Sequence, residues 1–176
     1  MSARAYLRAL TRDAHDRVDA LFTDHDLSNP DHYRRFLTVQ AAAYLPIEAA
    51  LDAAGVHRLI DDWAERRRGD LLRADLANLG MDVPEPVLPP RLADDAAIAG
   101  AAYVLEGSRL GGALLKRQLL PDVPQQFLNA PAAHGAWAQF VAAVERILYS
   151  DVRQESAGKA AIATFACFEE AARSRV

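Results

Sequence analysis

The sequence predicts an all-α protein that folds as a single-domain bundle of several helices. Apolar residues recur every three or four positions through most of the chain, which is the spacing that places them on one face of a helix. β-branched residues are sparse, and no stretch alternates between apolar and polar residues as a half-buried strand does. The length of 176 residues suits one domain with a sizeable core, so we expect a single helical domain over residues 1–176.

Four helical segments are predicted in the first half of the chain. The first precedes a turn at Ser28-Asn29-Pro30, and its inward face is expected to hold Leu7, Leu10, Ala14, Val18 and Leu21. The second leads from Asp31 to a stop at Gly55, and it should bend at Pro46, which lacks an N–H group. Its buried side is marked by Phe36, Ala43, Ile47 and Leu51. Two shorter segments follow, one with Ile60 and Trp63, the other with Leu71, Leu72, Leu76 and Leu79 before Gly80.

The second half begins with a loop over residues 83–90, which contains four prolines. A long helix is then expected over residues 92–119, ended by Pro121. Asn129 followed by Pro131 predicts the start of the next helix. That helix contains Trp137, Phe140, Val144 and Leu148. Ser150 is placed to cap the last helix, whose expected buried residues are Ile162, Phe165 and Phe168.

Composition and charge restrict the classes of function. The chain has 51% hydrophobic and 25% charged residues, with both signs mixed along its length, which favours packed amphipathic helices over disorder. The formal net charge of −4 gives no electrostatic basis for binding nucleic acid. The single cysteine, Cys167, cannot form an internal disulfide, and we expect it to pack as a small apolar residue in a reducing compartment.

The chain shows no pattern typical of secretion or membrane insertion. Arg4 and Arg8 interrupt the N-terminal segment where a signal peptide needs an apolar run. Uncharged stretches such as residues 96–105 are far shorter than the ~20 apolar residues of a membrane span. We therefore expect a cytoplasmic protein without a membrane partner.

Three glycines lie inside the long predicted helix, at Gly107, Gly111 and Gly112. Each costs ~1 kcal/mol relative to alanine in a helix interior. Gly107 and Gly111 are four residues apart and share a face, so they have a common explanation. Either this helix crosses another closely, or a flat ligand lies against its bare backbone. Spacing alone leaves both explanations open, because glycine pairs are a weak motif.

The first predicted helix contains a histidine with a carboxylate one turn later, at His15 and Asp19. A carboxylate in this position can accept a hydrogen bond from the second ring nitrogen of a metal-bound histidine. Arg8 lies two turns before His15 on roughly the same face, where a cation can meet a carboxylate of a ligand. Ordinary charge pairs on a surface helix are the alternative, which the spacing by itself favours.

Taken together, these segments resemble the haem oxygenase family. Their residue pattern is most similar to that of the bacterial enzymes that accompany bacteriophytochromes. The runs Leu7-Arg8-Ala9-Leu10-Thr11-Arg12-Asp13-Ala14-His15 and Asp19-Ala20-Leu21-Phe22 resemble the N-terminal proximal helix of the family. The run Tyr103-Val104-Leu105-Glu106-Gly107-Ser108-Arg109-Leu110-Gly111-Gly112 resembles its distal helix. The C-terminal Phe165, Phe168, Glu169 and Glu170 resemble its last helix. The resemblance spans most of the chain, and the two helix motifs together are fairly specific.

The resemblance implies a role for each matching residue. His15 becomes the proximal ligand of the haem iron, and Asp19 becomes its hydrogen-bonding partner. Gly107, Gly111 and Gly112 become the distal contacts of the haem. Arg8 and Tyr103 become candidates for contacting the haem propionates.

The chain departs from the animal-type members at one distal position. Those members have an aspartate directly after the first distal glycine, where it organises water near the bound oxygen. Ser108 stands there in this chain, as in the bacterial branch that it resembles. Ser108 and Arg109 are therefore the nearest polar candidates on the distal side, with a solvent-facing Arg109 as the alternative.

The remaining histidines and the densest basic run receive simpler interpretations. His25, His32, His57 and His134 fall near predicted turns or helix ends and share no metal-ligand spacing, so we expect solvated imidazoles. Arg66-Arg67-Arg68 is predicted to be a solvated face, with a docking site for an acidic electron donor as the alternative.

The resemblance implies oxygen-dependent opening of the haem ring to biliverdin, with release of iron and carbon monoxide. Haem is then both substrate and cofactor, and the reaction needs molecular oxygen and an external reductant. A ferredoxin or a reductase is the expected electron donor. The α isomer and a bacteriophytochrome as product acceptor are expectations for this branch. Two alternatives remain open: a haem-binding carrier or sensor without turnover, and a bundle with a structural or partner-binding role.

Overall fold

The structure is a computed structural model that describes residues 1–22 and 26–175, and these residues are helical without any strand. The all-α prediction is therefore confirmed. The α-helices are α1 (Ala3–Ala20), α2 (Pro30–Ala53), α3 (Trp63–Arg66), α4 (Gly69–Asn78), α5 (Asp95–Leu115), α6 (Ala136–Ile147) and α7 (Asp151–Arg173). Two short 3₁₀ helices, η1 (Val56–Arg58) and η2 (Lys116–Gln118), follow α2 and α5.

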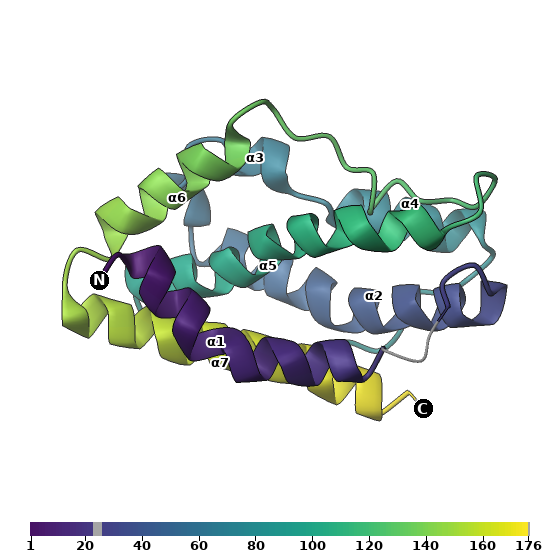
Figure 1. Cartoon of the computed structure of the whole chain (residues 1–176), viewed down its shortest axis with the longest axis horizontal. Coiled ribbons are helices and arrows are strands. Elements are labelled where there is room, and N and C mark those ends of the chain that lie inside the picture. Colours follow the sequence, from purple (N-terminus) through teal and green to yellow (C-terminus); the bar gives the residue numbers. More distant parts are fainter. Residues whose placement is uncertain (23–25, 176) are drawn as a thin grey trace.

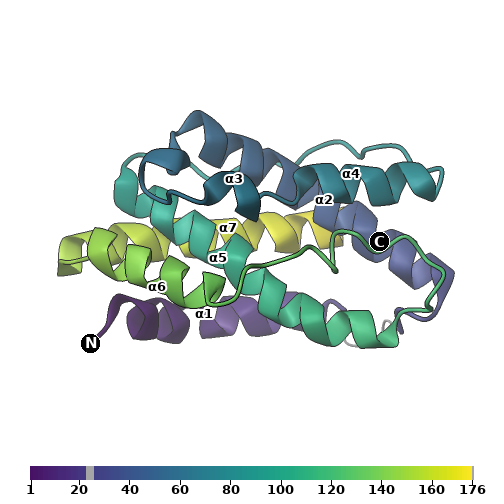
Figure 2. The same ribbon diagram turned by 90° about the horizontal axis from the view of Figure 1, so that it is seen from above.

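Helix α7 packs against α5, α1 and α2, and it lies along the lower edge of the bundle in Figure 1, partly behind α1. Seen from above, α2, α3 and α4 form one outer tier, α5, α6 and α7 the middle tier, and α1 the opposite outer tier (Figure 2). A continuous cluster of buried apolar residues runs through these tiers, from Ala3 and Leu7 in α1 to Phe168 and Ala172 in α7.

Local signals determine both ends of α2, as the sequence predicts. The Asn29 side chain accepts hydrogen bonds from the backbone N–H groups of Asp31 and His32, and Pro30 occupies the first helical turn. Gly55 follows the helix with φ of +80°, a conformation that favours glycine. The predicted buried residues of α2 are all buried, and the helix continues through Pro46.

Three predicted helix boundaries are wrong, both ends of α5 and the start of α6. Helix α5 covers Asp95–Leu115 instead of residues 92–119, because Asp94 caps its start through a hydrogen bond from the Ala97 N–H. Helix α6 begins at Ala136 instead of near Asn129. Residues 119–135, which we call the connector, have no regular helix within them.

Side chains from the rest of the bundle hold the connector in place. The buried Asp75 carboxylate accepts hydrogen bonds from the backbone N–H groups of Gln126 and Phe127, both at 2.9 Å. The Tyr33 hydroxyl donates to the Pro124 carbonyl at 2.7 Å. These long-range bonds hold residues 124–127 in a non-helical path, and regular helix begins only at Ala136, after Gly135 with φ of +77°.

Two residues expected on inward faces are exposed. Leu10 lies at the edge of α1, beside Gly158 of α7, because the buried stripe of α1 follows Ala3, Leu7, Thr11 and Ala14. Ile162 lies outside the buried stripe of α7. Cys167 is buried as expected, and burial raises the pKa of its thiol to about 11.

Among the described helices, none combines the length and the apolar character that crossing a bilayer requires. Of the histidines interpreted as solvated, His57 and His134 are exposed, whereas His32 is half-buried, with its Nδ1 3.2 Å from the Asp26 carbonyl oxygen. His25 lies outside the described residues.

Candidate functional site

Helix α1 presents His15 on the surface with the predicted carboxylate beside it. The Nδ1 atom of His15 lies 3.1 Å from an Asp19 carboxylate oxygen, one helical turn away. The His15 side chain is 57% exposed, and its ring meets the edge of Phe165 of α7 at a centroid distance of 5.9 Å. A carboxylate at Nδ1 favours the tautomer with its proton there and leaves Nε2 able to bind a metal.

Contacts at both ends hold α1 against the rest of the bundle. The Glu145 carboxylate of α6 accepts hydrogen bonds from the N–H groups of Ala3 and Arg4 at 2.8 and 3.0 Å. Near His15, Arg17 donates to Glu169 of α7 at 3.0 Å. The backbone that carries His15 is therefore fixed before any ligand binds.

The N-terminal half of α1 brings cations close to Tyr103 of α5. Burial raises the pKa of Tyr103, while the charges of Arg4 and Arg8 oppose that rise. The Arg4 guanidinium also lies over the Trp137 ring, 5.9 Å from its centroid. Arg8 and Tyr103, both predicted to contact an anionic ligand, thus lie in one neighbourhood, and the sequence did not identify Arg4 as a member.

The glycines of α5 separate into two kinds. A Cβ atom added at Gly107 or Gly111 would meet nothing within 4 Å, so both glycines border open space. A Cβ at Gly100 would overlap the Ala157 carbonyl oxygen of α7. Close helix crossing therefore explains Gly100 and does not explain Gly107 or Gly111. Gly112 faces the connector, where a Cβ would lie 3.2 Å from Leu128.

The two polar distal candidates point away from the open face. The Ser108 hydroxyl donates to the Leu105 carbonyl at 2.6 Å and accepts a hydrogen bond from Arg68 at 2.6 Å. Arg109 contacts Glu106 at 3.2 Å and the Arg66 carbonyl at 2.5 Å, and it is mostly buried. The alternative of a solvent-facing Arg109 is therefore wrong.

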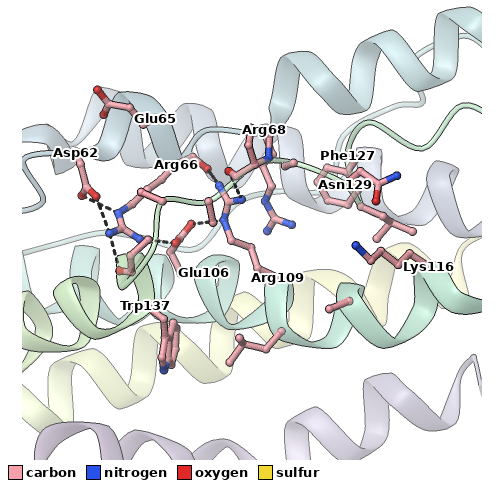
Figure 3. A pocket seen from close by; sticks show the side chains of 18 residues that line it. Asp62, Glu65, Arg66, Arg68, Glu106, Arg109, Lys116, Phe127, Asn129 and Trp137 are labelled. Carbon is pink, nitrogen blue, oxygen red and sulfur yellow. Dashed lines mark hydrogen bonds and ion pairs between the residues drawn. The ribbon is translucent and has the colours of Figure 1, made fainter.

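The prediction of a solvated face at Arg66-Arg67-Arg68 is also wrong. Arg66 is 4% exposed and Arg68 only 2%, whereas Arg67 alone is open to solvent. Arg66 donates to Asp62 through two nitrogens at 2.7 Å each and to Glu106 at 2.7 Å (Figure 3). The Arg68 guanidinium lies between two aromatic rings, 5.0 Å from Tyr44 and 4.7 Å from Phe127. The sequence shows that these residues are charged, but their partners lie up to 70 residues away along the chain.

A cavity of about 500 Å³ borders this arginine cluster. Residues of α3, α5, α6 and the connector line it, and none of them comes from α1. Figure 3 shows Arg66 between Asp62 and Glu106, with Lys116 at the other end of the cavity. This cavity is distinct from the open face at Gly107 and Gly111, and of the predicted site residues only Arg109 lines it.

Comparison with known proteins adds to this geometry. No protein-family model matches the chain. The chain is 32% identical to the haem oxygenase PigA of Pseudomonas aeruginosa in a match of 169 residues that covers 90% of this chain and 85% of that protein. It is 37% identical to a haem oxygenase of Xanthomonas campestris over 112 residues, covering 60% of this chain and 67% of that protein.

The fold has a counterpart among solved structures. The NO- and CO-bound haem oxygenase of Neisseria meningitidis superposes with a TM-score of 0.84 at 22% identity, covering 99% of this chain and 92% of that one. At this identity the likeness shows the fold. The sequence likeness to PigA spans nearly the whole chain, and from it we conclude that this chain belongs to the haem oxygenase family.

Proposed function

We propose that this chain opens the haem ring to biliverdin, using molecular oxygen and an external reductant and releasing iron and carbon monoxide. The observation that carries the proposal is the 32% identity to a haem oxygenase over 90% of the chain. The arrangement of α1 and α5 supports it, because a histidine paired with a carboxylate and a bare stretch of helix backbone suit a flat, iron-bearing ligand.

His15 is proposed as the iron ligand. The Asp19 oxygen at 3.1 Å orients the ring and raises the basicity of Nε2, which strengthens its bond to a metal. A neutral histidine on one side of haem iron leaves the other side free for oxygen, which is the chemistry that the bound haem supplies.

Gly107 and Gly111 are proposed to lie against the other face of the haem. The open space beside both residues fits a planar ring, and any side chain there would occupy it. A backbone wall without acidic or basic side chains restricts where a small iron ligand can lean, and it does not promote O–O cleavage of the peroxidase type. Gly112 lies on the side of the helix that faces the connector, where an added Cβ atom would be 3.2 Å from Leu128.

The propionates are proposed to contact Arg8 and Tyr103. Arg8 is exposed and supplies a charge, while the partly buried Tyr103 supplies a hydroxyl donor that stays protonated because burial raises its pKa. Arg4 adds a second cation to the same neighbourhood. Arginine is well suited to bind carboxylates in this way.

The finer features of the reaction rest on the sequence resemblance. We propose the α isomer of biliverdin as the product, a bacteriophytochrome as its acceptor, and a ferredoxin or a reductase as the electron donor. These proposals predict a product that assembles with an apo-bacteriophytochrome into a photochromic complex.

Reconstitution with haemin tests the proposed function. The complex should show the spectrum of histidine-ligated haem, and with a reductant in air it should lose its near-ultraviolet band and gain the broad red absorption of biliverdin. Chromatographic separation of the biliverdin isomers then tests α selectivity. A chain that binds no haemin would contradict the proposal.

One observation favours a second candidate, a haem-binding carrier or sensor without turnover. The Ser108 hydroxyl is occupied by Arg68 and the Leu105 carbonyl, so it does not replace the aspartate that orders distal water in the animal-type members. A complex that binds haemin through histidine and never opens the ring would establish this candidate instead.

A further inference from the structure

We propose that Arg66 and Glu106 are positioning residues that fix the distal half of α5, residues 107–115, relative to α1. This inference rests on the proposed function, because it concerns the helix stretch assigned to the distal side of the haem. The proposed function concerns the glycines of this stretch, and the inference concerns the residues that determine the position of their backbone.

The apolar core holds only the first half of α5. Residues 96–106 of the helix are all buried except Tyr103, whereas Gly112 alone is buried among residues 107–115. Leu110 and Leu114 are exposed. The distal half therefore extends beyond the core, and contacts other than core packing must determine its position.

Glu106 is the last buried residue before Gly107, and both of its carboxylate oxygens are bound. One oxygen accepts from Arg66 Nη1 at 2.7 Å, and the other lies 3.2 Å from Arg109 Nε. Glu106 is 3% exposed, so the pair with Arg66 is shielded from water and from salt. Arg109 also donates to the Arg66 carbonyl. Residues 106 and 109, which lie on either side of the first residues of the distal half, are therefore both attached to Arg66.

Arg66 is itself held by two contacts outside α5. Its guanidinium binds the Asp62 carboxylate through two nitrogens, and it donates to the Ala136 carbonyl at the start of α6. Burial lowers the pKa of Arg66, but the hydrogen bonds with Asp62 and Glu106 outweigh burial and leave this pKa raised. Arg66 is therefore a buried cation held by hydrogen bonds on several sides.

The charges around the cluster balance without an added ion. Four guanidinium groups, of Arg66, Arg67, Arg68 and Arg109, are matched by four carboxylates, of Glu48, Asp52, Asp62 and Glu106. Arg66 pairs with Asp62 and Glu106, Arg109 pairs with Glu106, and Arg67 lies 3.2 Å from Asp52. Glu48 accepts the backbone N–H of Arg68 at 2.8 Å. This neutral network of hydrogen bonds and ion pairs binds one side of α5. On the opposite side, at Gly107 and Gly111, an added Cβ atom would meet nothing within 4 Å. This asymmetry is what a positioning role requires.

Glu106→Gln is the primary test, because it keeps the shape of the side chain and removes its charge. Hydrogen exchange of the haem-free protein, followed by mass spectrometry, measures opening of the helix directly. Amides of residues 104–113 should exchange roughly tenfold or more faster in the variant, because local opening depends on local contacts. Amides of α7 should keep their rates.

Arg67→Gln is the control, because it removes a charge directly beside Arg66 from a side chain that pairs with Asp52 of α2 and does not touch α5. Its exchange rates should equal those of the unaltered protein. A double variant, Arg66→Met with Glu106→Met, covers the case in which Glu106→Gln unfolds. Replacing both members of a buried ion pair by apolar residues often preserves stability. The double variant should therefore melt near the unaltered protein and still show faster exchange at residues 104–113.

The haem complex gives the second readout. Loss of a fixed distal half should convert one biliverdin isomer into a mixture and change azide affinity for the ferric complex severalfold, with Arg67→Gln unchanged in both. Unaltered exchange, isomer composition and azide affinity in Glu106→Gln and in the double variant would overturn the positioning role. Faster exchange throughout the chain would also overturn it, since the network would then serve global stability. Failure of the unaltered protein to bind haemin would instead contradict the proposed function, and the exchange experiment would still test the network.

Discussion

The carbonyl oxygen of Ala157 on α7 occupies the place that a Cβ atom at Gly100 of α5 would take. Seven residues along the same helix, a Cβ at Gly107 would meet nothing within 4 Å. Glycine thus serves helix packing at one position of α5, and at the other it leaves the backbone bare. The two positions should respond oppositely to the same substitution.

Gly100→Ala should destabilise the haem-free protein, because overpacking against backbone typically costs ~1–3 kcal/mol. Gly107→Ala should leave the free energy of unfolding unchanged or raise it by up to ~1 kcal/mol, since alanine is the better helix former. Urea unfolding of the two variants under identical conditions measures the difference. The reverse order of stabilities would show that α5 does not pack as described.

Gly111→Leu should weaken haem binding or abolish turnover while the haem-free protein melts normally. The added side chain enters open space in the haem-free protein but occupies the volume proposed for the ring. Haemin titration and thermal unfolding separate the two effects. A variant that melts early and retains haem chemistry would show that Gly111 serves folding.

His15→Ala should remove the histidine-ligated haem spectrum. Because the side chain is largely exposed, the free energy of unfolding should change by no more than ~0.5 kcal/mol. His57→Ala is the matched control and should retain the spectrum. Asp19→Asn should keep the ligand but weaken haem binding by roughly 10-fold, through loss of the carboxylate that orients His15. An unchanged spectrum in His15→Ala would show that another residue is the iron ligand.

Arg8→Gln should weaken haemin binding by roughly twofold to fivefold, as expected for an exposed ion pair worth ~0.2–1 kcal/mol. Haem dimethyl ester, which lacks free propionates, should bind the variant and the unaltered protein equally. Arg12→Gln, an exposed charge on the same helix, is the control and should leave both affinities unchanged. If Arg8→Gln weakened the binding of the ester as strongly as that of haemin, Arg8 would not contact a propionate.

The Asp75 anchor of the connector should depend on pH. Burial raises the pKa of Asp75 above 3.8, although the N–H groups of Phe127 and Gln126 oppose that rise. The folded protein then holds this proton more tightly than the unfolded chain, so the contribution of Asp75 to the free energy of unfolding falls as pH rises through this pKa. The stability of the unaltered protein relative to Asp75→Asn should therefore decrease from pH 4 to pH 7 in urea unfolding. An increase would mean that the two N–H groups outweigh burial.

The sequence identifies features whose signals are local. Asn29, Pro30 and Gly55 determine the ends of α2 within a few residues, and the spacing of His15 and Asp19 on one helix makes their contact predictable. The start of α6 is not predictable in this way. Asp75 binds the connector at Gln126 and Phe127, about fifty residues along the chain, and no local pattern predicts that contact.

The buried arginines show the same limitation at the candidate site. A run of three basic residues is usually solvated, and only the fold reveals that Arg66 meets Glu106. A weak signal did exist in the sequence. Glu106 is the one charged residue within residues 96–108, an otherwise uncharged stretch of helix, and a buried carboxylate in such a place needs a cationic partner.

The division of α5 into a packed half and an unpacked half has a consequence for how the protein can change by mutation. Most substitutions near a reaction centre must trade activity against stability, because the same side chains serve both. Here Gly107 and Gly111 carry no packing, so variation at these positions alters the ligand environment at little cost to the fold. Gly100 tolerates little change, because a side chain there would meet the backbone of α7, and Glu106 can be replaced without loss of stability only together with its partner Arg66. Selection for a new product isomer or a new tetrapyrrole can therefore act at Gly107 and Gly111, while the packing of α5 at Gly100 stays unchanged.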